Sequence, residues 1–263
     1  MSAFEEAVRR LAPTASLGRL LRGGIRVSGL LLAVVVIGGV FTYLNSGFLT
    51  TTNLLELVRA MSSLAIVALG ETFVIMAGEL DLSVGATYGV AAMLMAQMWI
   101  HGTPFYLALA AGLGIGILIG AVNAFLTTIV KIPSFVVTLG ALNFVQGLTL
   151  LFSNAQGVDP AYVNPPVNAH DLSVFRDLGG STLPGNVPIQ VLWLLGVAIV
   201  AAVLLHRSLF GFRLSAIGGN AASARVAKLP IIRYKWIVFM ISGLLAALAG
   251  ILDFSFLGST DPS

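Results

Sequence analysis

The sequence contains no cysteine, and only 10% of its residues are charged. The absence of cysteine excludes disulfide bonds, thiolate metal sites and cysteine nucleophiles. Soluble domains usually carry about 25% charged residues, so the low charge content argues against a soluble fold. The three histidines, His101, His170 and His206, are scattered without the spacing of metal ligands. No metal or cofactor site is therefore predicted.

Long apolar segments fill most of the chain. Hydrophobic residues make up 57% of its 263 positions, and the mean hydropathy is +0.98. A helix needs roughly 20 apolar residues to cross a bilayer, and the uncharged run 82–130 is long enough for two crossings with a turn between them. We therefore predict an all-α, polytopic membrane protein with about seven transmembrane helices. The predicted spans are 27–44, 54–77, 84–100, 105–129, 134–153, 189–205 and 236–255.

The basic residues are distributed unevenly about these spans. If the N-terminus is cytoplasmic, 12 of the 14 Lys and Arg residues fall on the inner side, and the exceptions are Arg59 and Arg176. Such a bias is the positive-inside pattern of membrane proteins. It predicts one transmembrane domain over 1–263, with a cytoplasmic N-terminal segment at 1–26, an external loop at 154–188 and a cytoplasmic loop at 206–235. The net charge of +3 then follows topology and predicts no nucleic-acid partner.

The stretch 78–85, GELDLSVG, places two carboxylates inside an otherwise apolar region. An acid at the centre of a span costs roughly 3 kcal/mol on insertion scales. Gly78 and Gly85 flank the acids and weaken a helix there, so we predict a break between the second and third spans. Asp81 or Ser83 is expected to cap the following helix. A capped break and a hinge beside a polar translocation path are both compatible with this pattern.

Other polar residues lie within the predicted spans. Ser134 and Thr138 follow a proline and are four positions apart, so they share one helix face. Asn123 and Asn143 are further polar residues at membrane depth. Each of these four either joins helices or contacts a solute. The fourth span also carries a ladder of glycines, Gly112, Gly116 and Gly120, which predicts close helix packing.

Enzymatic chemistry is not expected from this residue set. No histidine lies in the middle of a span, and Glu79 and Asp81 are too close on one turn to face each other as a catalytic pair. The phosphate-binding pattern GxxxxGK[ST] is absent, so no ATP site of that kind is predicted in this chain. We predict no catalytic residues.

The cytoplasmic loop at 206–235 contains a short helix signal. Asn220 is suited to be its N-cap, Lys228 is expected in its last turn, and Pro230 is expected to end it. The surrounding sequence is too apolar for simple solvation. An exposed apolar helix in an inner loop indicates a docking surface for another protein.

Three stretches of the sequence together resemble a known family. They are ALGETFVIMAGELDLSVGA, GAVNAFLTTIVKIPSFVVTLGALNFVQGLTLL and SLFGFRLSAIGGNAASARVAKLPIIRYKWIVFMISGLLAALAGIL, and they cover most of 65–255 in order. The chain resembles the permease subunits of bacterial ABC-type monosaccharide importers, the ribose, xylose and galactoside group.

This resemblance implies a set of partners. They are a cytoplasmic ABC ATPase, an external sugar-binding protein that is periplasmic or lipid-anchored, a second permease chain that forms a homo- or heterodimer, and the lipid of the bacterial plasma (inner) membrane. It makes Asp81 and Ser83 signature positions of the family. The loop around Gly218, Gly219 and Asn220 is similar to the segment that couples the permease to the ATPase.

The residues expected to function fall into two groups. Those assigned to the translocation pathway or its hinge are Gly78, Glu79, Asp81, Ser83, Gly85, Asn123, Ser134, Thr138 and Asn143. Those assigned to ATPase coupling are Gly211, Gly218, Gly219, Asn220, Ala222 and Arg225.

The chain departs from the family pattern in two ways. An acidic residue often follows the glycine-glycine-asparagine of the coupling segment, and here the sequence is NAAS. The family also continues for further C-terminal spans, which are absent from this sequence. Three alternatives therefore remain beside a monosaccharide permease. They are a permease for another small polar solute such as a nucleoside, polyol or autoinducer, an ion-coupled transporter that uses Glu79 or Asp81, and a fragment that assembles without transporting.

Overall fold

The computed structural model describes residues 17–164 and 166–262, and these divide into two compact units, Met1–Leu54 and Leu55–Ser263. In the first unit, helix α2 (Leu17–Leu44) leads into a turn before α3 (Thr51–Met76) begins. The side chain of Asn53 donates to the carbonyl oxygen of Phe48 at 2.7 Å, which ties the start of α3 to this turn. Residues 1–16 of the predicted N-terminal segment lie outside the described residues.

The second unit contains the remaining long helices. They are the rest of α3, α4 (Val84–Ile100), α5 (Phe105–Thr128), α6 (Ser134–Phe152), α8 (Gln190–His206) and α11 (Ile231–Leu257). Each of the seven predicted spans corresponds to one helix. The largest differences are at α2, which begins at Leu17 and not at 27, and at α11, which begins at Ile231 and not at 236.

Four described helices, α3, α5, α6 and α11, are long and apolar enough to cross a membrane. Helices α8 and α9 (Leu209–Gly219) pass the same test together as a pair bent by 69°. The segment Leu31–Leu44 of α2 and helix α4 are apolar but shorter. The prediction of a helical, polytopic membrane protein is confirmed.

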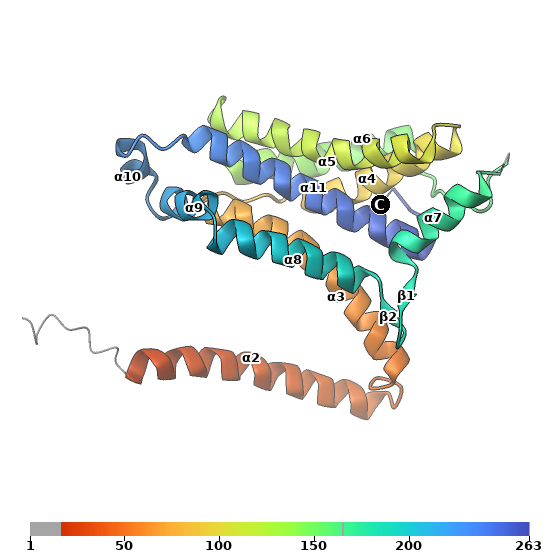
Figure 1. Ribbon diagram of the computed structural model, residues 1–263, viewed down its shortest axis with the longest axis horizontal. Helices are drawn as coiled ribbons and strands as arrows, with labels where there is room; N and C mark the ends of the chain where they lie inside the picture. Colours follow the sequence, from red (N-terminus) through yellow and green to blue (C-terminus); the bar gives the residue numbers. More distant parts are fainter. Residues whose placement is uncertain (1–16, 165, 263) are drawn as a thin grey trace, which may run out of the picture. The chain divides into compact units, whose positions relative to one another are not determined.

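Helices α4, α5, α6 and α11 lie side by side and form the centre of the second unit (Figure 1). The glycine ladder of α5 explains how α5 and α11 approach so closely. A Cβ atom at Gly116 would overlap the carbonyl oxygen of Gly243, and one at Gly120 would overlap that of Phe239. The predicted packing role of these glycines is therefore confirmed.

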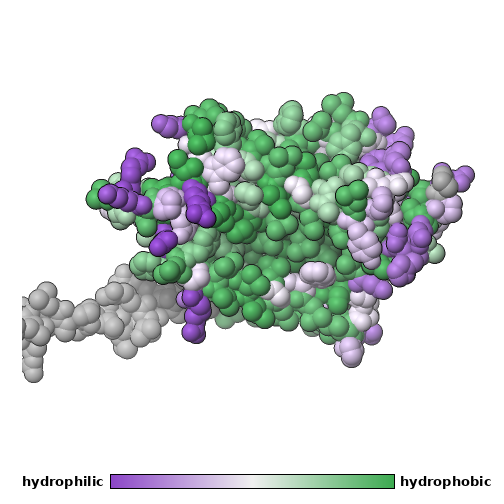
Figure 2. Space-filling view, turned by 45° about the horizontal axis from the view of Figure 1, so that its top comes forward, coloured by the Kyte–Doolittle hydropathy of each residue, from purple (hydrophilic) through white to green (hydrophobic). Residues whose placement is uncertain are grey.

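Short elements gather at the two ends of this bundle (Figure 1). One end carries α7 (Ala169–Gly179) and the hairpin of β1 (Thr182–Leu183) and β2 (Val187–Pro188), all within the predicted external loop. The other end carries α9 and α10 (Ala221–Val226). Figure 2 shows a hydrophobic band between two ends where hydrophilic residues gather, as expected for a bundle surrounded by lipid.

The loop at 206–235, predicted to be cytoplasmic, is more helical than the sequence pattern indicated. Helix α9 was not predicted. Its N-cap is Ser208, whose hydroxyl accepts the backbone N–H of Phe210 at 3.1 Å. The predicted N-cap of α10 is confirmed, because the Asn220 side chain accepts the N–H of Ser223 at 2.9 Å. The prediction for Lys228 is wrong. Helix α10 ends at Val226, and Lys228 follows it with a left-handed φ of 56°.

Candidate functional site

The predicted break is present, and α3 ends in a left-handed turn at Gly78. Its φ is +78°, a conformation that glycine adopts without strain. The N–H of Gly78 donates to the carbonyl of Ile75 at 3.0 Å, and that of Glu79 donates to Val74 at 3.1 Å. These two bonds form a Schellman motif, which satisfies carbonyls that the helix end would otherwise leave free.

The segment that follows is held by the first turn of α6. The hydroxyl of Ser134 accepts the N–H of Leu80 at 3.2 Å, and that of Thr138 lies 3.4 Å from the carbonyl oxygen of Leu80. Both hydroxyls lie on one face of α6, as their spacing predicted, and both residues are buried. Unpaired backbone groups at membrane depth cost several kcal/mol. Ser134 and Thr138 therefore make the extended segment possible.

Asp81 and Ser83 form the start of α4. The Asp81 carboxylate accepts both the backbone N–H of Ser83 at 3.0 Å and its hydroxyl at 2.6 Å. Ser83 occupies the N-cap position, but its side chain makes no capping bond. Its hydroxyl oxygen instead accepts from the Asn123 amide of α5 at 2.9 Å. Asp81 is thus the residue that stabilises the helix start, and the network joins the break to α5.

Glu79 points to a different partner from Asp81. Its carboxylate forms an ion pair with the ammonium group of Lys235 in the first turns of α11. Both side chains are mostly buried, which makes the pair less screened than a surface ion pair. The two acids therefore do not act as a pair with each other, as expected from their spacing.

The break also contacts helix α9. A Cβ atom at Gly218 would overlap the carbonyl oxygen of Met76, and the Cα of Gly218 lies 3.7 Å from the position of a Cβ at Gly78. Only a residue without a side chain fits at Gly218. By contrast, the position of a Cβ at Gly219 is open. This backbone contact links the surface at α9 and α10 directly to the end of α3.

Two predicted residues stay outside this network. Asn143 is exposed, and its amide donates to the carbonyl of Leu139 on its own helix at 2.9 Å. Gly85 is exposed in the first turn of α4, and a Cβ atom there would meet no atom within 4 Å. Neither residue meets the cluster around Asp81.

The predicted coupling residues lie on α9 and α10 or at their ends. Gly211 lies against the carbonyl oxygen of Leu205, where a Cβ would overlap it, so it permits the bend between α8 and α9. Asn220, Ala222 and Arg225 are exposed. Large apolar side chains are exposed beside them, at Leu209, Phe212 and Val226. Apolar and basic groups on one exposed surface are suited to contact another protein.

A second polar cluster was missed at the level of sequence. Asp253 of α11 accepts the hydroxyl of Ser63 of α3 at 2.6 Å and the hydroxyl of Tyr88 of α4. One turn away on α3, the guanidinium of Arg59 lies 3.8 Å from the ring centroid of Phe256. The sequence signal that could have revealed this cluster is Asp253, an acidic residue inside the predicted span 236–255. Between the two clusters, the Ser242 hydroxyl donates to Glu71 at 3.0 Å.

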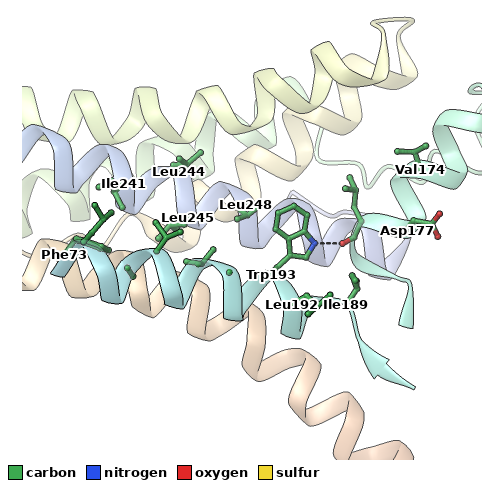
Figure 3. Close-up of a pocket in the computed structure, with 16 residues that line it drawn as sticks. Phe73, Val174, Asp177, Ile189, Leu192, Trp193, Ile241, Leu244, Leu245 and Leu248 are labelled. Atoms are coloured by element: carbon green, nitrogen blue, oxygen red, sulfur yellow. Dashed lines mark hydrogen bonds between the residues drawn. The ribbon is translucent and has the colours of Figure 1, made fainter. Parts of the chain in front are cut away.

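A large cavity along α8 is not suited to a polar solute. It has a volume of about 840 Å³ and lies along α8, between this helix and parts of α3, α7 and α11 (Figure 3). Its lining is apolar except for Asp177 and Trp193, and the indole N–H of Trp193 already donates to the carbonyl of Leu178 at 2.9 Å. A polar molecule there would lose its hydrogen bonds to water without replacement.

Metal chemistry has no support in the described residues. Over 17–164 and 166–262, no three His, Asp or Glu side chains gather in a way that would hold an ion. The polar groups of both clusters are paired mainly with hydroxyls, amides and one lysine. Their arrangement is suited to holding helix ends and contacting hydrogen-bonding solutes.

Comparison with protein families gives one match that covers most of the chain. Residues 53–263 match the family described as the permease component of the branched-chain amino acid transport system. No solved structure matches the chain.

Curated relatives give a consistent picture. The ribose import permease protein of Escherichia coli (strain K12) is 32% identical over 89% of this chain and 70% of its own length. The ribose import permease protein of Bacillus subtilis (strain 168) is 33% identical over 89% of this chain and 69% of its own length. The D-allose transport system permease protein of Escherichia coli (strain K12) is 32% identical over 82% of this chain and 63% of its own length.

Proposed function

The chain belongs to the family of permease components of the branched-chain amino acid transport system, and from this premise we propose that it is the membrane-spanning subunit of an ATP-driven importer for a monosaccharide. The observation that carries the proposal is its similarity to ribose and allose permeases over most of its length. ATP hydrolysis is assigned to a separate ATPase, and an external binding protein delivers the sugar. No catalytic residue is assigned to this chain.

The proposed topology follows the basic residues. The N-terminus and the α9–α10 end are cytoplasmic, and the end with α7 and the β hairpin is external. The exposed apolar residues Leu209, Phe212 and Val226, together with Arg225, form the proposed surface for the ATPase. A second permease chain and membrane lipid complete the assembly in the bacterial inner membrane.

The proposed mechanism uses the helix break as the moving part. ATP binding and hydrolysis displace α9, and the contact of Gly218 with the end of α3 transmits this displacement to the segment 77–83. A transporter needs an element with two arrangements that its ligands bias differently. The segment 77–83 is suited to this role because it is not helical and links the end of α3 to α5, α6 and α11 through side chains.

Reconstitution tests this proposal. The chain is incorporated into liposomes with its ATPase and binding protein, and uptake of radiolabelled D-ribose, D-allose and D-xylose is measured with and without ATP. We expect uptake of at least one sugar that depends on ATP and on both partners. Uptake that continues without the ATPase and stops when an ionophore removes the ion gradient would instead show an ion-coupled transporter.

A specific observation disfavours the ion-coupled alternative. Glu79 is paired with Lys235, and both bonds that Asp81 accepts come from Ser83. An ion site that uses these acids would have to disrupt the interactions that stabilise the helix break.

Import of a nucleoside or polyol in place of the three sugars would keep the permease assignment and change only the substrate.

A further inference from the structure

The cluster at the external end of α3 and α11 contains hydrogen-bonding groups that the chain leaves unused. Asp253 accepts two hydroxyl donors, from Ser63 and Tyr88. An ionised carboxylate has about four acceptor positions, so about two remain. Within residues 17–164 and 166–262, no Lys or Arg forms an ion pair with Asp253.

Arg59 supplies the complementary group. It is only 7% exposed, and its Nε–H has no hydrogen-bond partner in the described part of the chain. Its terminal nitrogen lies 3.5 Å from the exposed carboxylate of Glu56. Arg59 and Ser63 are four residues apart on α3 and therefore share one face. Phe256, which carries the guanidinium on its ring, lies nearly one turn from Asp253 on α11.

A polar cavity lies at the end of α11 and is lined in part by Phe256, whose ring contacts Arg59. It has a volume of about 470 Å³, and Phe256 lines it together with Asp159, Arg176 and Ser181. Binding sites for small molecules usually measure about 300–1,000 Å³, so a monosaccharide fits. Phe256 therefore connects this cavity to Arg59, which is one turn from Ser63 on α3.

On the basis of the proposed function, we propose that Asp253, Ser63, Tyr88 and Arg59 form a binding site for the hydroxyl groups of a neutral sugar on its way through the permease. A sugar hydroxyl both donates and accepts. It donates to the spare positions of Asp253 and accepts from Arg59. The two opposite charges together favour neither a cation nor an anion, whereas a neutral solute with several hydroxyls can use both the acceptor and the donor.

Helix packing alone does not account for this chemistry. Hydroxyls and amides are the usual groups that join membrane helices, because a charge at this depth costs roughly 3 kcal/mol. Intramembrane charges face the bundle interior or a water-filled cavity. Asp253 is half-buried and not fully enclosed, so part of the residue is open to a ligand.

Substitutions in the reconstituted complex test the site. We expect Asp253→Asn to lower D-ribose uptake about tenfold and Tyr88→Phe to lower it severalfold, because charged hydrogen bonds are stronger than neutral ones. Ser63→Ala should lower uptake about threefold. Two matched controls should keep full uptake. Ser62→Ala removes a neighbouring hydroxyl that bonds within α3, and Tyr106→Phe removes an exposed tyrosine hydroxyl on α5.

Singly deoxygenated riboses separate binding from packing. If Asp253 binds a sugar hydroxyl, the unmodified complex should take up the analogue that lacks this hydroxyl more slowly than D-ribose. The Asp253→Asn complex should take up that analogue and D-ribose at nearly the same rate. An equal loss for every analogue, or no loss with Asp253→Asn, would show that the cluster only joins helices.

A labelling experiment does not depend on which solute is transported. The chain has no cysteine, so Asp253→Cys introduces a single thiol. We expect the hydrophilic reagent sulfonatoethyl methanethiosulfonate to label it in membranes, because a site that binds a sugar on its way through the permease must be open to water. Leu64→Cys is the control, since Leu64 is more exposed on α3 but is expected to face lipid. Absence of labelling at 253 overturns the site, whereas absence of uptake by the unmodified complex overturns only the proposed function.

Discussion

The helix break at 77–83 and the cluster at Asp253 both place acids within the bundle, but they use them differently. At the break, Asp81 is 3% exposed, and its neighbours Ser83, Ser134 and Thr138 are also paired. At the other cluster, Asp253 is partly exposed and Arg59 keeps an unpaired donor. Family resemblance drew attention to the first site, yet the second has more hydrogen-bonding groups available for a ligand.

This difference indicates that the residues of a family signature motif can stabilise the fold, whether or not they bind a solute. The polar groups around Asp81 replace backbone hydrogen bonds that the break removes. The side chain of Asn123 is only partly paired, because its buried amide oxygen Oδ1 has no hydrogen-bond partner in the described residues. The break therefore combines a stabilised structure with the contact to α9, while solute recognition is assigned to the seam between α3 and α11.

The largest expected effect comes from the contact that joins α9 to the break. Gly218→Val should destabilise the protein by about 3 kcal/mol, because its side chain would overlap the carbonyl of Met76. Thermal unfolding of the purified permease measures this loss. Gly219→Val is the matched control, since a Cβ meets no atom there. Equal unfolding temperatures for the two variants would show that the break is independent of α9.

Removing the Asp81 carboxylate should have the next largest effect. Asp81→Ala leaves the N–H of Ser83 without its acceptor, and we expect a loss of about 2 kcal/mol. Asp81→Asn keeps an oxygen in place and should lose less. If both variants unfold normally but fail to transport, Asp81 contacts the solute, and the contrast with Asp253 disappears.

The ion pair between Glu79 and Lys235 is expected to contribute less. A double-mutant cycle of Glu79→Gln and Lys235→Met should give a coupling energy of about 1 kcal/mol, because the pair is partly screened. Unfolding temperatures of the two single variants and the double variant provide the measurement. A coupling near zero would mean that the break is held by its hydrogen bonds alone.

Arg225→Glu should have the smallest effect on stability. The residue is exposed on α10, so we expect a change within about 0.5 kcal/mol. Its effect on the partner should be larger, with association of the ATPase weakened about tenfold. Co-purification and sugar-stimulated ATP hydrolysis test this, and unchanged hydrolysis would remove α10 from the coupling surface.

Much of the fold follows from local sequence patterns. Apolar length predicted the spans, Gly78 predicted the break, and Asn220 predicted the cap of α10. These features depend on residues that are close in the chain, so they can be recognised without tertiary structure. Helix α9 was missed because its apolar residues and glycines resemble a loop beside a membrane span, although Ser208 is a typical N-cap.

The sequence by itself determined the helical membrane class, the positions of the helices and the location of the break, because a bilayer admits few alternatives to apolar helices. Only the tertiary structure decided which polar groups meet. Glu79 pairs with a lysine 156 positions away, and Ser63 donates to an acid 190 positions away. Such pairs arise from the packing of α3, α4 and α11, and local pattern carries no information about them. For this reason Asp253, an isolated acid in the sequence, becomes a candidate binding residue only when α3 and α4 bring their hydroxyls to it.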